Sequence, residues 1–266
     1  MIQDFLMHAV PDLQHSESES RRFGFGVSRL LVPEGDAVSD EEIVSLLQRS
    51  TSALVILRAE SARTSLPDKL KSLDGFDCLH ADTLVYYRWI MGSFVNNEGS
   101  RDQLRIVDDA SWGDVESVLT ESFSQYRNHY SANPRLSAGV TLSGYQEWAA
   151  GLMSNPETLT LIARDYETSR AIGFLLVAVD HSAGLAEILL NAVRPSAQRG
   201  GVYSALMREA RSRLVELGDI RDLYISTQSD NHAVIGAWEK LGLTRRLTLN
   251  TFHLMRRREF SGSVSS

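Results

Sequence analysis

The chain has 266 residues, of which 43% are hydrophobic and 23% charged. These are ordinary values for a globular protein, and the length allows two domains. The formal net charge of -7 argues against a general nucleic-acid binder and against a protein of anionic membranes, because both need a basic face. The single cysteine, Cys78, excludes a disulfide within the chain and argues against a cysteine-based zinc site.

The first residues, MIQDFLMHAVPDLQH, lack the basic segment and long apolar core of a secretory signal. No apolar run reaches the ~18–20 residues that a membrane span requires. We therefore expect a cytoplasmic protein with no membrane partner and no nucleic-acid partner. The last six residues, 261–266, are small and polar and are predicted to be a disordered tail.

The first 98 residues alternate between strand-like and helix-like segments. Ser39 is a plausible N-cap, and Ile43, Leu46 and Leu47 follow at helical spacing. The predicted strands and helices, in chain order, are a strand at 23–33, a helix at 40–48, a strand at 53–58, a helix at 65–73 and a strand at 84–90. This order predicts a small N-terminal α/β accessory domain, residues 1–98. The polar segment that follows places a linker at 99–103.

A second domain is predicted at 104–260. Its apolar runs predict strands at 104–107, 159–163, 172–179, 186–193, 223–227 and 247–255. Helical periodicity predicts helices at 110–123, 145–153, 203–217 and 233–241. A polar, aromatic loop at 124–139 separates the first two helices. Both domains therefore belong to the α/β (α+β) class.

The segment AEILLNAVRPSAQRGGVYSALMREA, residues 186–210, carries the clearest chemical signal. A buried strand runs into a turn at Pro195, and two glycines, Gly200 and Gly201, precede a well-patterned helix. Adjacent glycines let the backbone approach a ligand closely. The start of the helix adds unpaired N–H donors and the positive end of its dipole. Together these features predict a site for a diphosphate.

Other interpretations of this turn remain open. A dinucleotide-binding turn needs G-x-G-x-x-G at the first helix, and an ATP-binding loop needs Gly-Lys-Ser/Thr; the chain has neither at this place. A tight turn with spare glycines is the purely structural alternative.

Two motifs resemble the GNAT superfamily of N-acetyltransferases. Residues Val193, Pro195, Gln198, Gly201 and Leu206 fit the acyl-CoA loop V-x-P-x-x-Q-x-x-G-x-x-x-x-L. The segments 227–231 and 238–243 then resemble the block N-x-x-A-x-x-x-Y-x-x-x-G-F. The resemblance covers about 104–255 and implies a mixed, twisted central sheet flanked by helices, with acetyl-CoA as the co-substrate.

The resemblance also assigns residues to the cofactor. The strand before the loop would pair its backbone with the pantetheine arm, and the loop amides would hold the diphosphate. The residues implied are Asn191, Ala192, Val193, Gln198, Arg199, Gly200, Gly201, Val202, Tyr203, Ser204, Asn231 and Trp238.

Two of these positions depart from the family pattern. Tyr203 replaces a Gly or Ala of the loop. Trp238 stands where the family often has a Tyr that gives a proton to the departing thiolate, and an indole N–H has no useful pKa for this role. Trp238 either packs against CoA or belongs to the core.

The catalytic base and acid have candidates in the sequence. Glu187 is the candidate base, because Ala186-Glu187-Ile188 resembles the histone-acetyltransferase branch. By strand alternation it is expected to share a face with Leu189, Asn191 and Val193. The alternative is a solvent-facing carboxylate. For the acid, the candidates are His253 in the last predicted strand, His129 or Tyr130 in the loop, and water.

The acceptor side is predicted from the loop 123–134 and the segment 145–149. They resemble TDP-fucosamine acetyltransferase and its relatives, which acetylate amino groups of nucleotide-linked sugars. A less close resemblance to the same group extends to residues 23–27, 75–76, 82–86 and 251–254. The candidate substrate-binding residues are Tyr126, His129, Tyr130 and Asn133. The alternative is an irregular surface connection.

The resemblance predicts an N-acetyltransferase that acts by direct transfer in a ternary complex on a nucleotide-linked amino sugar, as a monomer or homodimer and without a metal. Two alternatives remain: an acetyltransferase for another amine (an amino acid, polyamine, antibiotic or protein) and a non-catalytic acyl-CoA-binding protein.

Overall fold

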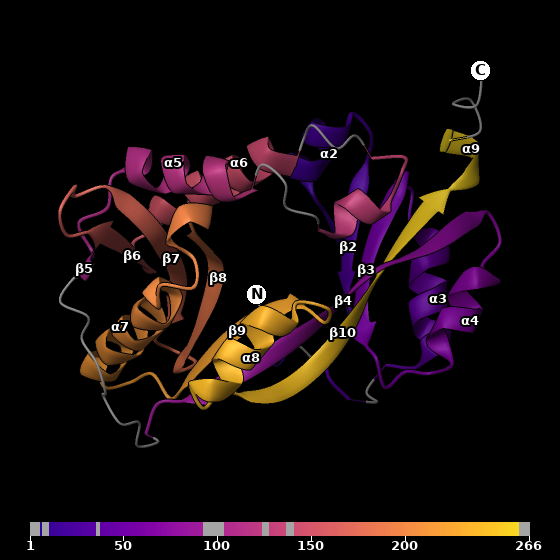
Figure 1. Cartoon of the computed structure of the whole chain (residues 1–266). Coiled ribbons are helices and arrows are strands. Elements are labelled where there is room, and N and C mark those ends of the chain that lie inside the picture. The colour runs from indigo at the N-terminus through magenta and orange to yellow at the C-terminus, as the bar shows by residue number, and fades with distance from the viewer. Residues whose placement is uncertain are drawn as a thin grey trace. The chain divides into compact units, whose positions relative to one another are not determined.

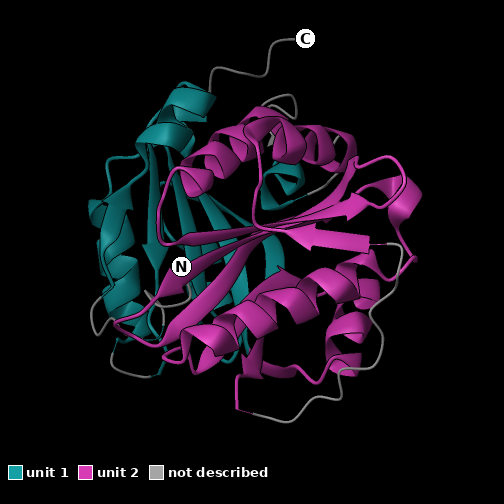
Figure 2. Cartoon of the chain, turned by 90° about the vertical axis from the view of Figure 1, so that its left-hand side faces the viewer, with its two compact units in different colours: residues 1–85, 127–140, 247–266 teal, residues 86–126, 141–246 magenta. Residues whose placement is uncertain are grey.

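The structure is a computed structural model that describes residue 6 and residues 11–35, 38–92, 104–123, 128–136 and 141–260. Its contacts divide the chain into two compact units, shown in Figure 2. Unit 1 contains 1–85, 127–140 and 247–266, and unit 2 contains 86–126 and 141–246.

Unit 1 is a strand layer with helices packed on it (Figure 1). Its strands follow the order β1-β2-β3-β10-β4; β2 and β3 are parallel, and β1 and β10 are antiparallel to their partners. The elements are β1(Leu13–His15), α2(Glu17–Phe23), β2(Val27–Leu31), α3(Asp40–Arg49), β3(Leu54–Glu60), α4(Leu66–Lys71), β4(Phe76–Ile90), η1(His129–Ala132), β10(Thr244–Arg256) and α9(Arg257–Phe260). Both β4 and β10 extend into unit 2 at one end.

The start of α3 shows why this segment folds as the sequence predicts. The Ser39 hydroxyl accepts a hydrogen bond from the Glu42 amide at 3.2 Å, and the Glu42 carboxylate accepts one from the Ser39 amide at 2.7 Å. This reciprocal capping box satisfies two donors that a helix start leaves unpaired. Ile43 and Leu47 then point into the core of unit 1, so the predicted N-cap and apolar face are both confirmed.

Unit 2 holds the strands that follow β4 in the order β9-β8-β7-β6-β5. Its elements are β5(Leu104–Val107), α5(Trp112–Phe123), α6(Thr141–Met153), β6(Thr158–Asp165), β7(Ala171–Asp180), β8(Leu185–Val193), η3(Pro195–Ala197), α7(Val202–Leu217), β9(Asp222–Gln228) and α8(His232–Lys240). Strands β5 to β8 are antiparallel, whereas β8 and β9 are parallel and are joined through α7.

Helices cover both faces of the unit 2 strands (Figure 1). One core lies between α5, α6 and the strands and is formed by buried residues such as Val118, Ala149, Phe174 and Leu190. Helix α7 lies on the other face and buries Leu206, among others. The predicted mixed sheet flanked by helices is therefore confirmed.

The units do not divide where the sequence suggests. The predicted linker, 99–103, and the tail, 261–266, lie outside the described residues. The segment 128–136 and most of β10 pack with the N-terminal strands, so unit 1 takes residues from the predicted second domain. The predictions also missed β1 and α2 and made β4 too short, since it begins at Phe76.

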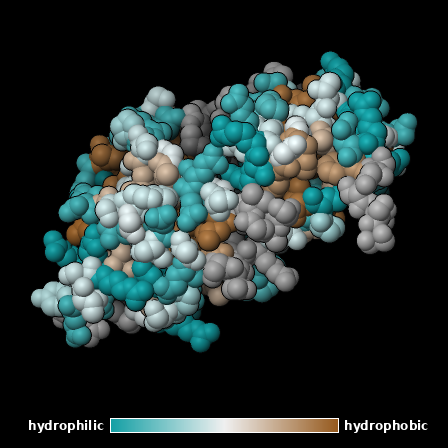
Figure 3. Space-filling model, turned by 90° about the horizontal axis from the view of Figure 1, so that it is seen from above, coloured by the Kyte–Doolittle hydropathy of each residue, from teal (hydrophilic) through white to brown (hydrophobic). Residues whose placement is uncertain are grey.

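The surface is mostly hydrophilic on the face shown in Figure 3, with hydrophobic residues interspersed. The large exposed apolar side chains come from several elements and include Ile90, Trp112, Trp148, Tyr166, Val215 and Leu217. Within the described ranges, no helix is long and apolar enough to span a bilayer.

Gly173 in β7 offers a test of packing in unit 2. A Cβ there would lie 3.1 Å from Ala192 O, 3.1 Å from Leu206 Cδ1 and 3.2 Å from Val193 Cγ2. We expect Gly173→Ala to lower the free energy of unfolding by about 1–3 kcal/mol through overpacking, measured by urea denaturation followed by circular dichroism.

The matched control is Gly236→Ala in α8, where a Cβ meets nothing within 4 Å. Here alanine should stabilise by about 0.5–1 kcal/mol, because glycine weakens a helix interior. Equal effects of the two substitutions would contradict the packing described for β7.

Candidate functional site

The parallel strands β8 and β9 pair only at their beginnings. Their register runs from Leu185 opposite Asp222 to Ile188 opposite Ile225. Both strands continue further, β8 to Val193 and β9 to Gln228. In the described part of unit 2 the ladder between them therefore ends halfway, and the second half of β8 has an open edge.

The hydrogen bonds around β8 show which main-chain groups face that edge. The Arg194 amide donates to Ile172 O at 2.9 Å, so Arg194 directs its main-chain groups toward β7. Because successive residues of a strand direct these groups to opposite sides, Asn191 and Val193 direct theirs away from β7. The hydrogen bonds of Val193 O are consistent with this direction, because it accepts them from the side chains of Ser122 at 3.3 Å and Gln198 at 3.2 Å.

A β-bulge interrupts β8 next to this edge. Leu190 lies opposite Leu176, but Ile188 lies opposite Val177, so Leu189 is an extra residue. An extra residue reverses the alternation of faces along the bulged strand. Glu187 therefore lies on the opposite face from Asn191 and Val193, and the expectation that they share a face is wrong.

The surroundings of Glu187 also differ from the solvent-facing alternative. Its side chain is buried, with 5% exposed. It lies between Ala178 of β7 and Tyr224 of β9 in the register.

The turn after β8 is anchored by Arg194. This guanidinium is 4% exposed and donates to Ala171 O at 2.7 Å, to Ser117 Oγ at 2.8 Å and to the Glu121 carboxylate. The contacts hold the turn against β7 and α5. The 3-10 turn η3 follows, and its Pro195 supplies no amide donor.

The residues before α7 adopt left-handed conformations. Arg199 has φ of 62° and Gly201, the N-cap, has φ of 81°. Gln198, Arg199 and Gly200 are exposed. The helix begins its main-chain bonding with the Ala205 amide, which donates to Gly201 O at 3.0 Å.

The first turn of α7 therefore presents main-chain donors. Helix geometry gives the amides of Val202, Tyr203 and Ser204 no acceptor within the helix. They carry the positive end of the α7 dipole, which favours an anion. No side chain of the N-cap residue fills this position, because the residue is glycine.

Helix α8 contacts this end of α7. The indole N–H of Trp238 donates to Tyr203 Oη at 2.7 Å. Trp238 is 1% exposed, and burial raises the pKa of Tyr203. At the start of α8, Asn231 Nδ2 donates to Thr227 Oγ1 at 3.0 Å.

A second set of candidate residues meets in unit 1. Tyr130 of η1 donates its hydroxyl to Glu19 of α2, and Arg29 of β2 binds the same carboxylate at 2.6 and 3.0 Å. Burial alone raises the pKa of Glu19, but the hydrogen bonds and charge of Arg29 outweigh it and hold the pKa at about 2. Glu19 and Arg29 are not among the residues predicted from the sequence, although Gly24 as a C-cap and the acidic first turn of α2 were signals for this helix.

His253 of β10 lies beside this group with both ring nitrogens engaged. Asn133 Nδ2 lies 3.1 Å from His253 Nδ1, and His129 Nδ1 lies 2.9 Å from His253 Nε2. The Arg135 amide donates to Asn133 Oδ1 at 3.1 Å, which fixes the orientation of the Asn133 amide. His253 therefore accepts at Nδ1 and donates from Nε2 to His129.

This geometry does not support His253 as a direct acid or base. His253 is fully buried, and burial lowers its pKa to about 4; burial also lowers the pKa of His129 well below the ordinary value. His129 and Asn133 are buried as well, with 7% and 1% exposed. These three residues hold the 128–136 segment in place through contacts with one another.

The structure thus gathers the predicted residues into two groups. The cofactor candidates lie in unit 2, and His129, Tyr130, Asn133 and His253 lie in unit 1. Tyr126 lies outside the described residues.

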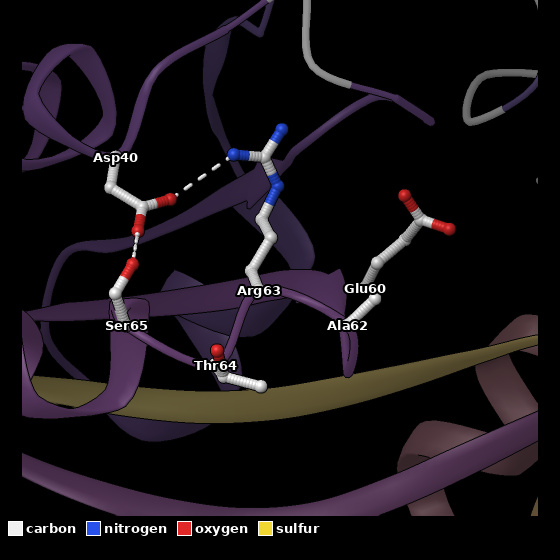
Figure 4. Close-up of a pocket in the computed structure, with 6 residues that line it drawn as sticks. All are labelled: Asp40, Glu60, Ala62, Arg63, Thr64 and Ser65. Atoms are coloured by element: carbon white, nitrogen blue, oxygen red, sulfur yellow. Dashed lines mark hydrogen bonds and ion pairs between the residues drawn. The ribbon is translucent and has the colours of Figure 1, made fainter.

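A separate polar pocket of about 230 Å³ lies in unit 1 (Figure 4). Its charged groups are used internally, because Arg63 binds Asp40 at 3.1 Å and Gly35 O at 2.6 Å. Its lining residues are Asp40, Glu60, Ala62, Arg63, Thr64 and Ser65. Over the described ranges, no cluster of three or more His, Cys, Asp or Glu residues forms a metal site.

The half-paired strands followed by a glycine-capped helix define the class of the domain. Residues 115–243 match the sequence model of the Acetyltransferase (GNAT) family. These residues therefore form a domain of the acetyltransferase type, whose enzyme class is acyltransferase and whose co-substrate is acetyl-CoA. A search of curated protein sequences finds no match to the chain.

Solved structures show the same fold. A GCN5-related N-acetyltransferase from Sphaerobacter thermophilus has a TM-score of 0.64 and 12% identity over 91% of this chain and 75% of its own. A conserved protein of unknown function from Staphylococcus epidermidis has a TM-score of 0.58 and 11% sequence identity, over 96% of this chain and 97% of its own. A GCN5-related N-acetyltransferase from Kribbella flavida has a TM-score of 0.57 and 15% sequence identity, over 86% of this chain and 81% of its own.

The buried histidines predict a pH dependence of stability. The pKa of His253 is about 4 in the fold and ~6.5 in an unfolded chain. The unfolded state therefore binds more protons between these values, so stability is complete above pH ~6.5 and is lost as the pH falls toward 4. Between pH 7 and pH 5, the protonation of His253 in the unfolded state should lower the free energy of unfolding by about 2 kcal/mol.

We expect His253→Gln to show a smaller loss over the same interval in urea unfolding. The exposed His181, whose pKa is raised beside Asp219, is present in both proteins and cancels in the difference. An identical pH slope in the two proteins would contradict a neutral, buried His253.

Proposed function

We propose that this chain transfers an acetyl group from acetyl-CoA to a primary amine by direct transfer in a ternary complex. The observation that carries the proposal is the open edge of β8 followed by the first-turn amides of α7, which have no acceptor within the helix. Both features belong to unit 2 and are joined by residues 194–201. One binds an extended amide chain and the other binds an anion.

The residues fit the parts of the co-substrate. The diphosphate would accept from the amides of Val202, Tyr203 and Ser204, with the glycine N-cap allowing close approach. The pantetheine arm contains amides that suit the outward main-chain groups of Asn191 and Val193. Acetyl-CoA bound in this way supplies an activated acyl group, and the protein supplies proximity and orientation.

Amide donors next to the bulge would also stabilise negative charge on the thioester oxygen. Preorganised main-chain N–H groups are effective at such positions because they need no rearrangement during the reaction. Glu187, the only carboxylate of β8 and two residues before Leu189, remains our proposed acceptor of the amine proton.

We propose a nucleotide-linked amino sugar as the acceptor. The resemblance of 123–134 and 145–149 supports this class, and so do aromatic side chains of α5 and α6. Phe123 and Tyr145 lie with ring centroids 4.6 Å apart, and Trp148 is 42% exposed. The bond from Ser122 to Val193 O at 3.3 Å brings the end of α5 to the open edge of β8. Aromatic faces there suit stacking on a sugar or base.

Gly201→Val tests the cofactor site. A β-branched side chain strains the left-handed N-cap by about 1–2 kcal/mol and blocks the approach of phosphate. We expect at least about tenfold weaker binding of CoA by calorimetry, a loss of roughly 1.4 kcal/mol.

Gly218→Val is the matched control, because Gly218 caps the other end of α7 at the same φ of 81°. It carries the same backbone strain away from the proposed site. It should therefore keep CoA affinity within about twofold while α7 is destabilised similarly. Equal losses of affinity in both variants would count against the loop.

The acceptor is tested with a panel of nucleotide-linked amino sugars, free amino sugars, amino acids, polyamines and aminoglycosides, read by CoA release. We expect the nucleotide-linked amino sugars to give the highest kcat/KM. A higher kcat/KM for another amine would show that the acceptor belongs to a different class, while the proposed acetyl transfer would still hold. Tight CoA binding with no turnover on any amine would favour a non-catalytic binding protein.

A further inference from the structure

Two arginines lie on the same face of unit 1, on the paired strands β2 and β3 (Figure 1). In the parallel register of these strands, Arg29 lies opposite Ile56, two residues before Arg58. Residues opposite one another, and residues two apart on one strand, direct their side chains to the same face. Arg29 and Arg58 are therefore neighbours on one face, at a spacing that long side chains can bridge.

The fold neutralises one of these two charges. The Glu19 carboxylate binds Arg29 at 2.6 and 3.0 Å and also accepts from Tyr130. Among the residues that the structure describes, the side chain of Arg58 has no hydrogen-bond or ion-pair partner, although its Nε is buried. A charge that leaves water without a partner is costly. Arg58 therefore indicates a position that an anion from outside the chain can fill.

The described neighbours of Arg58 supply no counter-charge. Glu60, two residues further along β3, accepts from the Gly35 amide at 3.2 Å. Thr251 lies opposite Arg58 on β10 and is fully buried, and its hydroxyl also has no partner in the described ranges. Asp82, on the next strand β4, forms no ion pair with Arg58 either. The charge of Arg58 is therefore uncompensated in the described part of unit 1.

Electrostatics show that both arginines act on the same place. Burial is the main cause of the low pKa values of His129 and His253, and the positive charges of Arg58 and Arg29 lower both values further. The charge of Glu19 acts on His253 in the opposite direction. Two guanidinium groups and a single carboxylate therefore act on these histidines, and the sum of the three charges is positive.

We propose that Arg29 and Arg58 bind the phosphate group of a phosphorylated small molecule on this face of unit 1. The planar guanidinium fork matches phosphate oxygens, and it keeps its charge at any working pH. A phosphate presents oxygens in several directions and can accept from both arginines at once, whereas a carboxylate presents its oxygens along one edge. The side chain of Arg29 is 46% exposed while Glu19 fixes its orientation, so it is both accessible and held in place.

This inference goes beyond acetyl transfer and does not depend on it. Arg29 and Arg58 belong to unit 1, whereas the proposed CoA site belongs to unit 2. The acceptor proposed above, a nucleotide-linked amino sugar, carries phosphate groups and is one member of the ligand class.

The test is calorimetry with inorganic pyrophosphate as the probe, on the full chain carrying Gly201→Val. That substitution weakens the proposed anion site at α7, so the remaining heat reports on unit 1. We expect the further change Arg58→Gln to raise the Kd of pyrophosphate at least about tenfold, a loss of roughly 1.4 kcal/mol. Arg58→Lys should give an intermediate Kd, because an ammonium lacks the planar fork. Since Arg58 has no described partner to lose, the Tm without pyrophosphate should not fall in Arg58→Gln.

Arg49→Gln in α3 is the matched control, because it removes the same charge from unit 1. Arg49 is exposed and donates to Ser45 of its own helix at 3.2 and 3.0 Å. Helix α3 packs on the opposite face of the strands, against residues such as Leu57. The Kd should stay within about twofold of the parent protein, because salt screens a distant exposed charge.

Nuclear magnetic resonance locates the bound anion. Pyrophosphate should shift the ring-proton signals of His129 and His253 and raise both pKa values, because it offsets the charge of Arg58. These changes should disappear in Arg58→Gln. The signal of His181, an exposed residue of unit 2, should not move.

The outcomes separate this inference from the proposed function. Equal Kd values in Arg58→Gln and Arg49→Gln, or unchanged signals of His129 and His253, would overturn the arginine site and leave acetyl transfer unaffected. Binding of citrate as tight as that of pyrophosphate would also overturn it, because the site would then not select phosphate. Failure of the wild type to bind CoA would overturn the proposed function, but the effect of Arg58→Gln on pyrophosphate would still support this site.

Discussion

Main-chain hydrogen bonding is the constraint on which this domain depends. Buried N–H and C=O groups need partners, yet β8 loses its β9 partner after Ile188. The strand can stay open only where something else meets its main-chain groups. Side chains of Ser122 and Gln198 cover Val193 O, and the remaining groups suit an extended ligand. The glycine-capped start of α7 presents the same kind of unmet donor.

Arg194 connects these two features. It lies between the last residue of β8 and the turn, and it is buried among partners on β7 and α5. A buried guanidinium is tolerated when its donors are matched. The arrangement fixes the direction in which the chain leaves β8, and so the place where α7 begins.

Unit 1 buries a polar segment, whose side chains therefore need hydrogen-bond partners inside the fold. Residues 128–136 carry histidine, asparagine and tyrosine groups that need partners. The ionised Glu19–Arg29 pair and the neutral His253 provide them. The neutral His253 is stable near this ionised pair because each of its ring nitrogens has a defined donor or acceptor role.

Much of this could be predicted from the sequence, for identifiable reasons. The N-cap at Ser39 and the turn at Gly200-Gly201 depend on neighbouring residues, so the sequence alone indicates them. The bulge at Leu189 left no sign, because Ile188, Leu189 and Leu190 are all apolar and show no alternation that an extra residue could interrupt. The burial of Glu19 was equally hidden. Its partner Arg29 is 10 residues away on β2, but Tyr130 is 111 residues away, and only the fold brings the three together.

The assignment of 128–136 and most of β10 to unit 1 was hidden for a related reason. Composition does not report which strands a segment joins. Strand β10 returns from the end of the chain to pair with β3. Such long-range pairing is set by register and packing, not by any nearby residue.

The left-handed residues before α7 have a consequence for the energetics of recognition. Arg199 holds a conformation that L-residues adopt reluctantly, between η3 and the glycine N-cap of α7. Strain in a turn that the fold itself holds is part of the free energy of folding rather than of binding. A receptor shaped in advance loses little entropy on association, so affinity at this turn should depend on rigidity as much as on charge.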